Sequence, residues 1–348
     1  MYKGTGISKD QLSDDGEPCI LYGELYTKYK SETIREVISK TNIDNTKLVR
    51  SKANDVIIPC SGETAEDIAT ARCVLNGNIL LGGDLNIIRL HGYDGAFMSY
   101  QLNGRRKYDI AKVAQGVSVV HLYGEHLKGV KTINPCLEEQ KKIAKLLSLL
   151  DERIVTQNKI IDKLQSLIKG LRVGLMQIEN GNIVHLGEIA QIYQPQTISS
   201  TELTEDGFLV YGANGIIGKY KQYNHKTEQI CITCRGNTCG MVNYTKPMSW
   251  ITGNAMVINT DEHQNKVCKR YLYHYLSAYN FNSLISGSGQ PQIVRTPLEQ
   301  LKVTLPTFLE QKQKATFLDK IQGKIEICNK ALNLYLQQKQ YLLRQMFI

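Results

Sequence analysis

Two long amphipathic segments dominate the hydrophobic pattern of this chain. In residues 137–177, apolar positions recur at alternating steps of three and four, which places them along one face of an α-helix. Residues 309–346 repeat this pattern in the same register. We therefore predict two long helices with matching apolar seams. The predicted seam residues are Leu147, Leu150, Ile154, Ile161, Leu164, Ile168, Leu318, Ile321, Ile325, Leu332, Tyr335 and Leu342.

Short apolar runs separated by turn residues occupy the chain on either side of the first long helix, and such runs are typical of β-strands. In the first half they lie at 19–22, 56–60, 86–90 and 117–122, with a short helix expected near 96–102. In the second half they lie at 208–211, 229–233 and 255–258, with a helix expected at 269–277. The spacing Thr307–Glu310 predicts a capping box at the start of the second long helix.

The two halves share short motifs and differ between them. Residues 6–16 match residues 197–207, Leu21-Tyr22-Gly23 matches Val210-Tyr211-Gly212, and Glu139-Gln140-Lys141 matches Glu310-Gln311-Lys312. The lead-in segment 183–191 has no counterpart before Met1, so either the first unit does without this strand or the chain begins late. We predict an α+β protein with mixed α/β domains at 1–134 and 180–305 and long helices at 135–179 and 306–348.

Composition narrows the class of protein only slightly. The chain of 348 residues is long enough for two domains, and no apolar run reaches the ~18 residues of a membrane span. Nine cysteines without a framework favour a reduced, cytoplasmic protein. The net charge of +9 is compatible with a polyanionic partner but is weak evidence when taken alone.

No motif predicts catalysis or a bound cofactor. The glycine-rich stretch 212–220 misses the spacing of a phosphate loop, and a strand connection is the favoured interpretation. Cys231, Cys234 and Cys239 lack a second Cys/His pair of zinc-site spacing, and buried small side chains are favoured over ligands. The chain has no dinucleotide or S-adenosylmethionine fingerprint after a strand. We therefore predict that it is not an enzyme by itself and holds no metal.

Polar and basic side chains on the loops remain as candidates for binding DNA. Arg, Asn and Gln can read base edges, whereas Lys and Ser/Thr mostly hold phosphates. For any single residue, solvated surface is the alternative interpretation. The candidates are Lys28, Lys30, Arg105, Arg106, Lys107, Asn214, Lys219, Tyr220, Lys221, Gln222, Arg235, Asn237, Thr238, Gln290 and Gln292.

The repeated motifs resemble those of one known family. They are the Gly-Ile-Ser opening with its Leu-Ser/Thr and Gly, the Tyr-Gly strand end, the Gly-Asn-x-x-Gly turn at 236–240, and Pro-x-Leu-Glu-x-Gln or its equivalent at 135–140 and 306–311. Together they resemble the specificity subunit of type I restriction-modification enzymes. The resemblance implies two target recognition domains, at 1–134 and 180–305, and two antiparallel spacer helices.

The resemblance also implies partners and cofactors. Such a subunit reads a bipartite double-stranded DNA target and docks two modification (methyltransferase) subunits and the restriction subunits, with no membrane involved. S-adenosylmethionine, ATP and Mg then belong to the partner subunits, and none is expected in this chain. We also expect the stiff helix pair to set the length of the unread DNA between the two half-sites.

Three alternatives stay open at this point. A nucleic-acid-binding or homo-oligomeric interaction module outside restriction would purify as a stable homodimer without sequence preference. An exchangeable half of a recombining system would read only one half-site. An enzyme with an unrecognised site would show activity from the chain alone.

Overall fold

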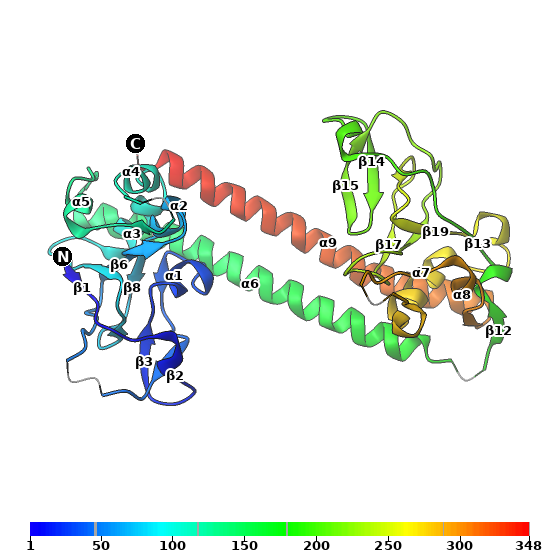
Figure 1. The fold of residues 1–348 in the computed structure, drawn as a ribbon, viewed down its shortest axis with the longest axis horizontal. Helices are drawn as coiled ribbons and strands as arrows, with labels where there is room; N and C mark the ends of the chain where they lie inside the picture. The colour runs from blue at the N-terminus through cyan, green and yellow to red at the C-terminus, as the bar shows by residue number, and fades with distance from the viewer. Residues whose placement is uncertain (45–46, 117, 179, 288, 348) are drawn as a thin grey trace. The chain divides into compact units, whose positions relative to one another are not determined.

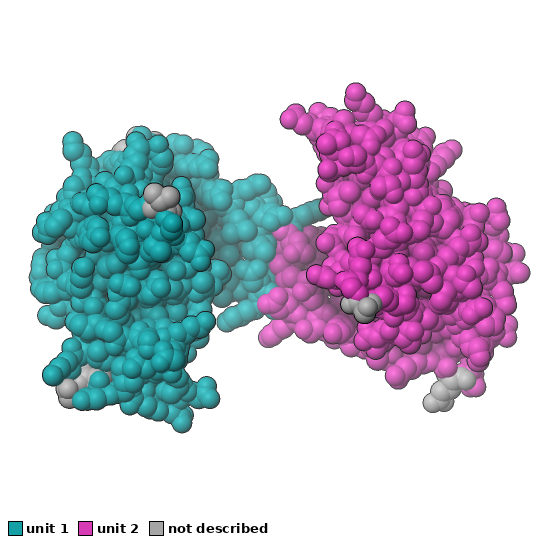
Figure 2. Space-filling model, viewed as in Figure 1, with its two compact units in different colours: residues 1–159, 330–348 teal, residues 160–329 magenta. Residues whose placement is uncertain are grey.

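The protein is described by a computed structural model that covers residues 1–44, 47–116, 118–178, 180–287 and 289–347. The chain divides into two compact units (Figure 2). Unit 1 contains Met1–Lys159 and Lys330–Ile348, and unit 2 contains Ile160–Asn329. The unit boundaries fall within the two long helices, which are drawn in Figure 1, so each of them contributes one part of its length to unit 1 and the other to unit 2. Among the described residues, no helix is both long and apolar enough to cross a membrane.

Unit 1 is built around a five-stranded sheet of order β1-β10-β6-β8-β4, a four-stranded sheet of order β2-β5-β3-β9 and the small pair β11-β7. Its strands are β1 (Tyr2–Lys3), β2 (Leu12–Ser13), β3 (Glu17–Ile20), β4 (Thr33–Ile34), β5 (Ser39–Thr41), β6 (Asp55–Pro59), β7 (Ser61–Gly62), β8 (Arg72–Val74), β9 (Leu80–Leu81), β10 (Leu85–Ile88) and β11 (Val120–His121). Its short helices are η1 (Lys9–Gln11), α1 (Glu24–Thr27), α2 (Ala65–Ile68), α3 (Gly95–Asn103), α4 (Lys107–Lys112) and α5 (Gly124–Lys128).

Unit 2 repeats this plan with a four-stranded sheet of order β13-β19-β16-β17, a three-stranded sheet of order β15-β14-β18 and the pair β12-β20. Its strands are β12 (Asn182–His185), β13 (Gln191–Tyr193), β14 (Phe208–Gly212), β15 (Gly215–Tyr220), β16 (Ile230–Thr233), β17 (Val242–Tyr244), β18 (Trp250–Ile251), β19 (Ala255–Asn259) and β20 (Lys302–Leu305). Its short helices are η2 (Leu186–Glu188), η3 (Ser200–Glu202), η4 (Asp261–His263), α7 (Lys269–Ala278), η5 (Phe281–Leu284) and α8 (Arg295–Glu299).

The strands β6 and β16, in the interior of the main sheets, show how a short apolar run forms a buried strand. Every residue of β6 and of β16 is buried, and both strands are rich in isoleucine. β-Branched side chains pack well on a pleated surface, so such runs form strands that are covered on both faces. The strands predicted at 19–22, 56–60, 86–90, 208–211, 229–233 and 255–258 are confirmed to within two residues, whereas at 117–122 only β11 forms and Val117 lies outside the described residues.

The repeated opening motif folds in the same way in both units. In each unit a 3-10 turn, η1 or η3, starts with a serine whose backbone N–H donates to the side chain three residues later: Ser8 to Gln11 and Ser199 to Glu202. The motif ends on a glycine with positive φ, 106° at Gly16 and 128° at Gly207. A Cβ on Gly207 would lie 2.3 Å from the Tyr220 carbonyl oxygen, so only glycine fits there.

The two long helices are α6 (Leu137–Met176) and α9 (Phe308–Gln345). They confirm the two predicted helices to within one residue at each end. The capping box at Thr307 is confirmed as well, because its N–H donates to the Glu310 carboxylate at 2.9 Å. At ~1.5 Å rise per residue, the 40 residues of α6 span roughly 60 Å.

The helices pack in opposite directions within the units. In unit 1, Ala144 and Leu147 from the first part of α6 share a core with Leu343 from the last part of α9 and with Phe347, which follows that helix. In unit 2, Ile168 from the last part of α6 shares a core with residues from the first part of α9, namely Ala315, Leu318 and Ile325. This pairing confirms the expected antiparallel helix pair. Each unit is therefore completed by a helix segment that belongs to the other repeat.

The lead-in strand of unit 2 is β12, which pairs with β20 through Ile183 opposite Thr304. Residues 131–134 of unit 1 correspond to β20, because both segments directly precede the proline before a long helix. These residues, all within the described part of the chain, form no strand. Instead, the side-chain amide of Gln101 bonds both the N–H and the carbonyl of Ile133, each at 2.7 Å. A side chain thus satisfies backbone groups that a neighbouring strand satisfies in unit 2.

Candidate nucleic-acid interface

The start of α6 is tied to the start of α3 by one glutamine. Gln140 donates through Nε2 to the Pro135 carbonyl at 2.7 Å, and its Oε1 accepts from the Asp94 N–H at 3.0 Å. Asp94 is the residue that caps α3, because its side chain accepts from the Phe97 N–H. Gln140 is 1% exposed, so water cannot reach its amide. Without these two hydrogen bonds the buried amide would be unsatisfied, which costs free energy.

Gln311 makes the same connection in unit 2. It donates through Nε2 to the Pro306 carbonyl at 3.0 Å and accepts from the Cys268 N–H at 2.9 Å. Cys268 is the N-cap position of α7, and Gln311 is also 1% exposed. The repeated Glu-Gln motif of the sequence therefore fixes a short helix of each recognition unit to the long helix that follows it.

A buried ionic cluster joins the last part of α9 to unit 1. The Lys339 ammonium pairs with Asp151 of α6 at 2.6 Å and with Glu32, while Tyr100 of α3 and Ser31 donate hydrogen bonds to Asp151 at 2.7 and 2.8 Å. The Lys339 side chain is 12% exposed. Burial opposes its charge, but Glu32 and Asp151 together raise the pKa of Lys339 above its usual range. Burial also raises the pKa of Glu32, in spite of the neighbouring ammonium.

Unit 2 has a different polar network between α7 and the two long helices. Arg172 of α6 donates through Nε to His274 Nδ1 at 3.1 Å, and His274 Nε2 lies 3.1 Å from Asp319 Oδ1. Because Arg172 can only donate, Nδ1 must accept, and His274 is neutral with its proton on Nε2. Burial is the main cause that lowers the pKa of His274. The Arg172 guanidinium also lies over the Tyr273 ring, 5.3 Å from its centroid.

A polar cleft opens in unit 2 where several of the predicted residues meet. It has a volume of about 290 Å³ and contains the predicted Arg235 and Gln292. Two further polar residues, Gln194 and Arg295, were not predicted and lie in the same cleft. The complete lining is Tyr193, Gln194, Arg235, Met256, Gln292, Ile293, Val294 and Arg295. Two guanidinium groups and two amides in one cleft are groups that can read guanine and adenine edges.

The other predicted residues of unit 2 lie around this cleft or on the hairpin of β14 and β15. Asn237 and Thr238 follow Arg235 in a turn, and Gln290 belongs to the loop that ends at Gln292. Asn214 lies in the hairpin turn, which meets the end of β16 because Thr233 donates to the neighbouring Ala213 carbonyl. The structure therefore brings the turn that carries Asn214 next to the strand that leads to Arg235.

The far end of the same hairpin carries the remaining candidates. Lys219 pairs with Asp206 at 3.4 Å, and the Tyr220 ring packs edge-on against Trp250 with 5.0 Å between the ring centroids. Lys221 and Gln222 are exposed. Trp250 thus contacts part of the Tyr220 ring, and the DNA contacts predicted for these residues stay predictions.

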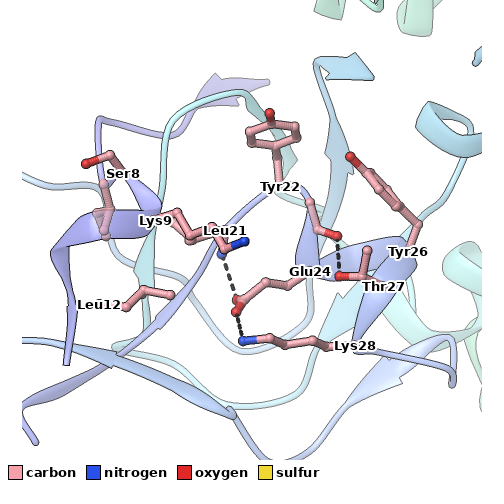
Figure 3. A pocket seen from close by; sticks show the side chains of 11 residues that line it. Ser8, Lys9, Leu12, Leu21, Tyr22, Glu24, Tyr26, Thr27 and Lys28 are labelled. Atoms are coloured by element: carbon pink, nitrogen blue, oxygen red, sulfur yellow. Dashed lines mark hydrogen bonds and ion pairs between the residues drawn. The ribbon is translucent and has the colours of Figure 1, made fainter. Parts of the chain in front are cut away.

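In unit 1, the predicted Lys28 lies beside a cavity of about 580 Å³ (Figure 3). Its ammonium pairs with the buried Glu24 at 2.6 Å, and Glu24 also accepts from the Leu21 N–H at 3.0 Å. Figure 3 shows these two interactions as dashed lines within the pocket. Lys28 therefore compensates a buried carboxylate as well as facing solvent, and Lys30 is exposed nearby in the chain.

The predicted basic run Arg105, Arg106 and Lys107 lies at the turn between α3 and α4. The preceding Gly104 approaches α9 so closely that a Cβ there would lie 2.8 Å from the Leu343 carbonyl oxygen. Arg106 pairs with Asp109 at 3.4 Å and is mostly buried, whereas Arg105 is exposed. This run is therefore placed against the helix scaffold of unit 1.

The predicted seam residues divide into two groups by burial. Leu147, Leu150, Ile161, Ile168, Leu318 and Ile325 are buried. Ile154, Leu164, Ile321, Leu332, Tyr335 and Leu342 are half-buried. Lys339, which the sequence pattern shows only as a polar interruption of the seam, is the centre of the ionic cluster.

Comparisons with known proteins agree with this architecture. Residues 179–336 match the family model described as the type I restriction modification DNA specificity domain. The Escherichia coli type I restriction enzyme EcoprrI specificity subunit is 32% identical over 140 residues, which cover 39% of this chain and 34% of that protein. The MjaVIII specificity subunit of Methanocaldococcus jannaschii is 24% identical over 356 aligned positions, covering 89% of this chain and 81% of that one. The chain is related to type I restriction enzyme specificity subunits.

Solved structures share the fold over nearly the whole of this chain. The S subunit of a type I restriction-modification system from M. genitalium superposes with a TM-score of 0.70 at 18% identity, covering 100% of this chain and 93% of that one. A chain from a structure of type I complex assembly and conformational transition gives a TM-score of 0.52 at 16% identity, over 90% of this chain and 86% of that one. The fold class inferred from the sequence is thereby confirmed, and the family model and the relatives named above confirm the family resemblance.

Proposed function

We propose that this chain is the specificity subunit of a type I restriction-modification complex, and that it reads a bipartite DNA target with one unit for each half. The observation that carries this proposal is the repeat itself. Two units share one scaffold, down to the paired glutamines Gln140 and Gln311, but present different side chains at their loops. A subunit that reads two different half-sites needs both properties.

The helix pair gives the two readers a common frame. Because both units share α6 and α9, binding of one half-site makes binding of the other effectively intramolecular. A helix pair is stiff compared with a loop, so it also fixes the helical length between the readers. We expect this length to set the number of unread base pairs.

Partner subunits supply the chemistry. The chain is non-catalytic, and methylation and cleavage are carried out by other subunits of the complex. Two modification subunits dock on the helix pair, where large apolar side chains are exposed: Leu146, Leu149, Leu167, Phe317, Ile327 and Leu334 are each at least 49% exposed. Exposed apolar side chains that form a contiguous patch mark an interface, and we expect the modification subunits to cover these residues. S-adenosylmethionine binds to the modification subunits, and ATP with Mg to the restriction subunits.

Methylation mapping tests the proposal. The chain is expressed with its modification subunit in a host that lacks adenine methylation, and methylated adenines are mapped across the host DNA. The expected result is one motif with two specific halves separated by a fixed number of unread base pairs. Random methylation, or methylation by the modification subunit without this chain, contradicts the proposal. A stable homodimer without sequence preference would favour an interaction module instead.

A further inference from the structure

The cleft of unit 2 has a counterpart in unit 1 that sequence motifs did not reveal. The loop that ends at Gln292 is closed by two backbone hydrogen bonds between Ser286 and Gln292, both 2.8 Å long. In unit 1, Gln115 and His121 close a loop of the same length by the same two bonds, at 2.9 and 2.7 Å. In both loops the second residue is a glycine with positive φ.

The strand beneath the loop corresponds as well. The residue after each loop donates to the carbonyl of a cysteine at the end of the central strand: Leu122 to Cys60 at 2.7 Å and Ile293 to Cys234 at 3.0 Å. These cysteines begin matching sequences, Cys-Ser-Gly-Glu-Thr at 60–64 and Cys-Arg-Gly-Asn-Thr at 234–238. Ser61 therefore occupies the position of Arg235, and His121 occupies the position of Gln292.

The edge strands complete the correspondence. Tyr2 lies opposite Ile87, which lies opposite Ile57 on the central strand. In unit 2, Tyr193 lies opposite Val257, which lies opposite Cys231. Ile57 and Cys231 precede Cys60 and Cys234 by the same number of residues. Tyr2 and Lys3 thus match Tyr193 and Gln194, which line the cleft of unit 2.

The unit 1 residues at these positions are Tyr2, Lys3, Ser61 and His121, and Tyr123 corresponds to Val294 of the unit 2 cleft. We name this set the unit 1 reading surface: Tyr2, Lys3, Ser61, His121 and Tyr123. His121 pairs with Ser61 across two strands. The rings of His121 and Tyr123 stack with 6.2 Å between their centroids, and the Lys3 ammonium lies 5.9 Å from the centroid of Tyr123. Tyr2 is 54% exposed and Tyr123 is 46% exposed.

This surface carries a different chemistry from the cleft of unit 2. In place of the Arg235 guanidinium and the Gln194 and Gln292 amides, it offers a hydroxyl, an imidazole and an ammonium beside an exposed aromatic ring. The Ser61 hydroxyl also donates to Asp84 at 3.2 Å, which orients it. Such groups hydrogen-bond bases and phosphates, but in another pattern.

We infer that the unit 1 reading surface determines the base preference for the first half of the DNA target, in the way that the cleft of unit 2 does for the second half. The inference rests on the proposed function. It replaces the expectation that Arg105, Arg106 and Lys107 read bases, because that run lies at the turn against the helix scaffold.

Binding measurements on the assembled complex test the inference. The full chain and its modification subunits are titrated against three duplexes: the mapped target, the target with one half scrambled and the target with the other half scrambled. The variant His121→Ala/Tyr123→Ala alters the unit 1 reading surface, and Arg235→Ala/Gln292→Ala alters the cleft of unit 2. Tyr108→Ala/Lys112→Ala removes another exposed tyrosine and cation from unit 1, where Lys112 lies 4.4 Å from the Tyr108 ring centroid.

The expected results separate the two halves. Scrambling either half weakens binding of the wild type by about tenfold or more. For His121→Ala/Tyr123→Ala, scrambling one half no longer weakens binding, while scrambling the other still does. For Arg235→Ala/Gln292→Ala, scrambling the opposite half no longer weakens binding. The control variant Tyr108→Ala/Lys112→Ala behaves as the wild type.

Three outcomes would overturn the inference: unchanged discrimination by His121→Ala/Tyr123→Ala, loss of preference for the same half in both variants, or loss of first-half preference on replacing Arg105 and Lys107. A swap variant, Ser61→Arg/His121→Gln, guards against a loss that reflects misfolding. It is expected to change the first half of the methylated motif and leave the second half unchanged. If the wild type methylates no bipartite motif, the proposed function fails rather than this inference alone.

Discussion

Unit 1 and unit 2 join an equivalent short helix to the helix pair through different polar networks. Where α3 of unit 1 presents Tyr100 to Asp151, α7 of unit 2 presents His274 to Asp319. Where α9 inserts Lys339 into unit 1, α6 inserts Arg172 into unit 2. The hydrogen bonds of Gln140 and Gln311, in contrast, are the same. The backbone attachment of each unit is thus retained, whereas the buried polar contacts beyond it have diverged.

The largest effect on stability is expected from removing the buried charge of Lys339 in unit 1. Lys339→Met leaves Glu32 and Asp151 as two buried carboxylates without a cation, and breaking such a pair typically costs about 3–5 kcal/mol. We expect unit 1 to lose about 3 kcal/mol of stability, measured by hydrogen exchange at the amides of β6. Lys330→Met, which removes an exposed lysine from the same helix, should change little. Equal exchange in both variants would show that the ionic cluster is not essential to unit 1.

The hydrogen bonds of Gln140 and Gln311 should contribute similar amounts to the stability of their two units. Gln140→Ala leaves the Asp94 N–H and the Pro135 carbonyl without their partner, and each unsatisfied buried group costs on the order of 1–3 kcal/mol. Gln311→Ala does the same in unit 2. Hydrogen exchange should show a loss of about 2 kcal/mol at β6 for the first variant and at β16 for the second. A loss of stability in the unit whose glutamine was not replaced would contradict the conclusion that each glutamine stabilises its own unit.

Acid should affect the two units differently. The folded-state pKa of His274 is lowered, so the folded protein binds fewer protons there than the unfolded chain. The stability that neutral His274 contributes is therefore fully present above its unfolded pKa, about 6.5, and is lost as pH falls through the folded pKa. Below about pH 6.5, the free energy of opening at β16 should fall, as measured by hydrogen exchange corrected for the intrinsic pH dependence of the exchange rate, and His274→Gln should weaken this dependence. An unchanged pH profile in the variant would assign the acid sensitivity elsewhere, for example to His225, whose pKa burial also lowers.

The smallest expected effect concerns the helix starts. Thr307 and Glu310 form a capping box at α9, whereas Cys136 precedes Glu139 at the same place in α6. Cys136→Thr should complete a capping box and stabilise unit 1 by about 0.5 kcal/mol, and Thr307→Cys should destabilise unit 2 by a similar amount. Thermal unfolding of the two variants and of the double exchange measures both signs. A stabilisation by Thr307→Cys would contradict the assigned cap.

The long helices and central strands could be predicted because periodicity is a local signal. Ten or more seam positions fix the period of α6 and α9, and a run such as Val56-Ile57-Ile58 leaves few alternatives to a buried strand. Lys339 could not be interpreted in this way. A lysine in a seam indicates only a polar interruption, and its partner Glu32 lies at the opposite end of the sequence.

The base-reading residues that we propose for unit 1 could not be found by searching the sequence for basic side chains. Basic clusters such as Arg105-Arg106-Lys107 are conspicuous in the sequence, whereas Ser61 and His121 are not. The signal that could have found them is the repeated Cys-x-Gly-x-Thr at 60–64 and 234–238. In unit 2, Arg235 and Gln292 were predicted and do share a cleft, because guanidinium and amide side chains there coincide with the loops.

We expect the helix pair that the two DNA readers share to set the distance between their half-sites. The most direct test removes one heptad from each helix, residues 156–162 of α6 and 328–334 of α9, and maps the methylated motif. Seven residues at ~1.5 Å amount to about 10 Å, or about three base pairs at ~3.4 Å each. We predict that both specific halves of the motif stay the same while the unread spacer shortens by about this amount. A folded variant that methylates the original motif with its spacer unchanged would contradict it.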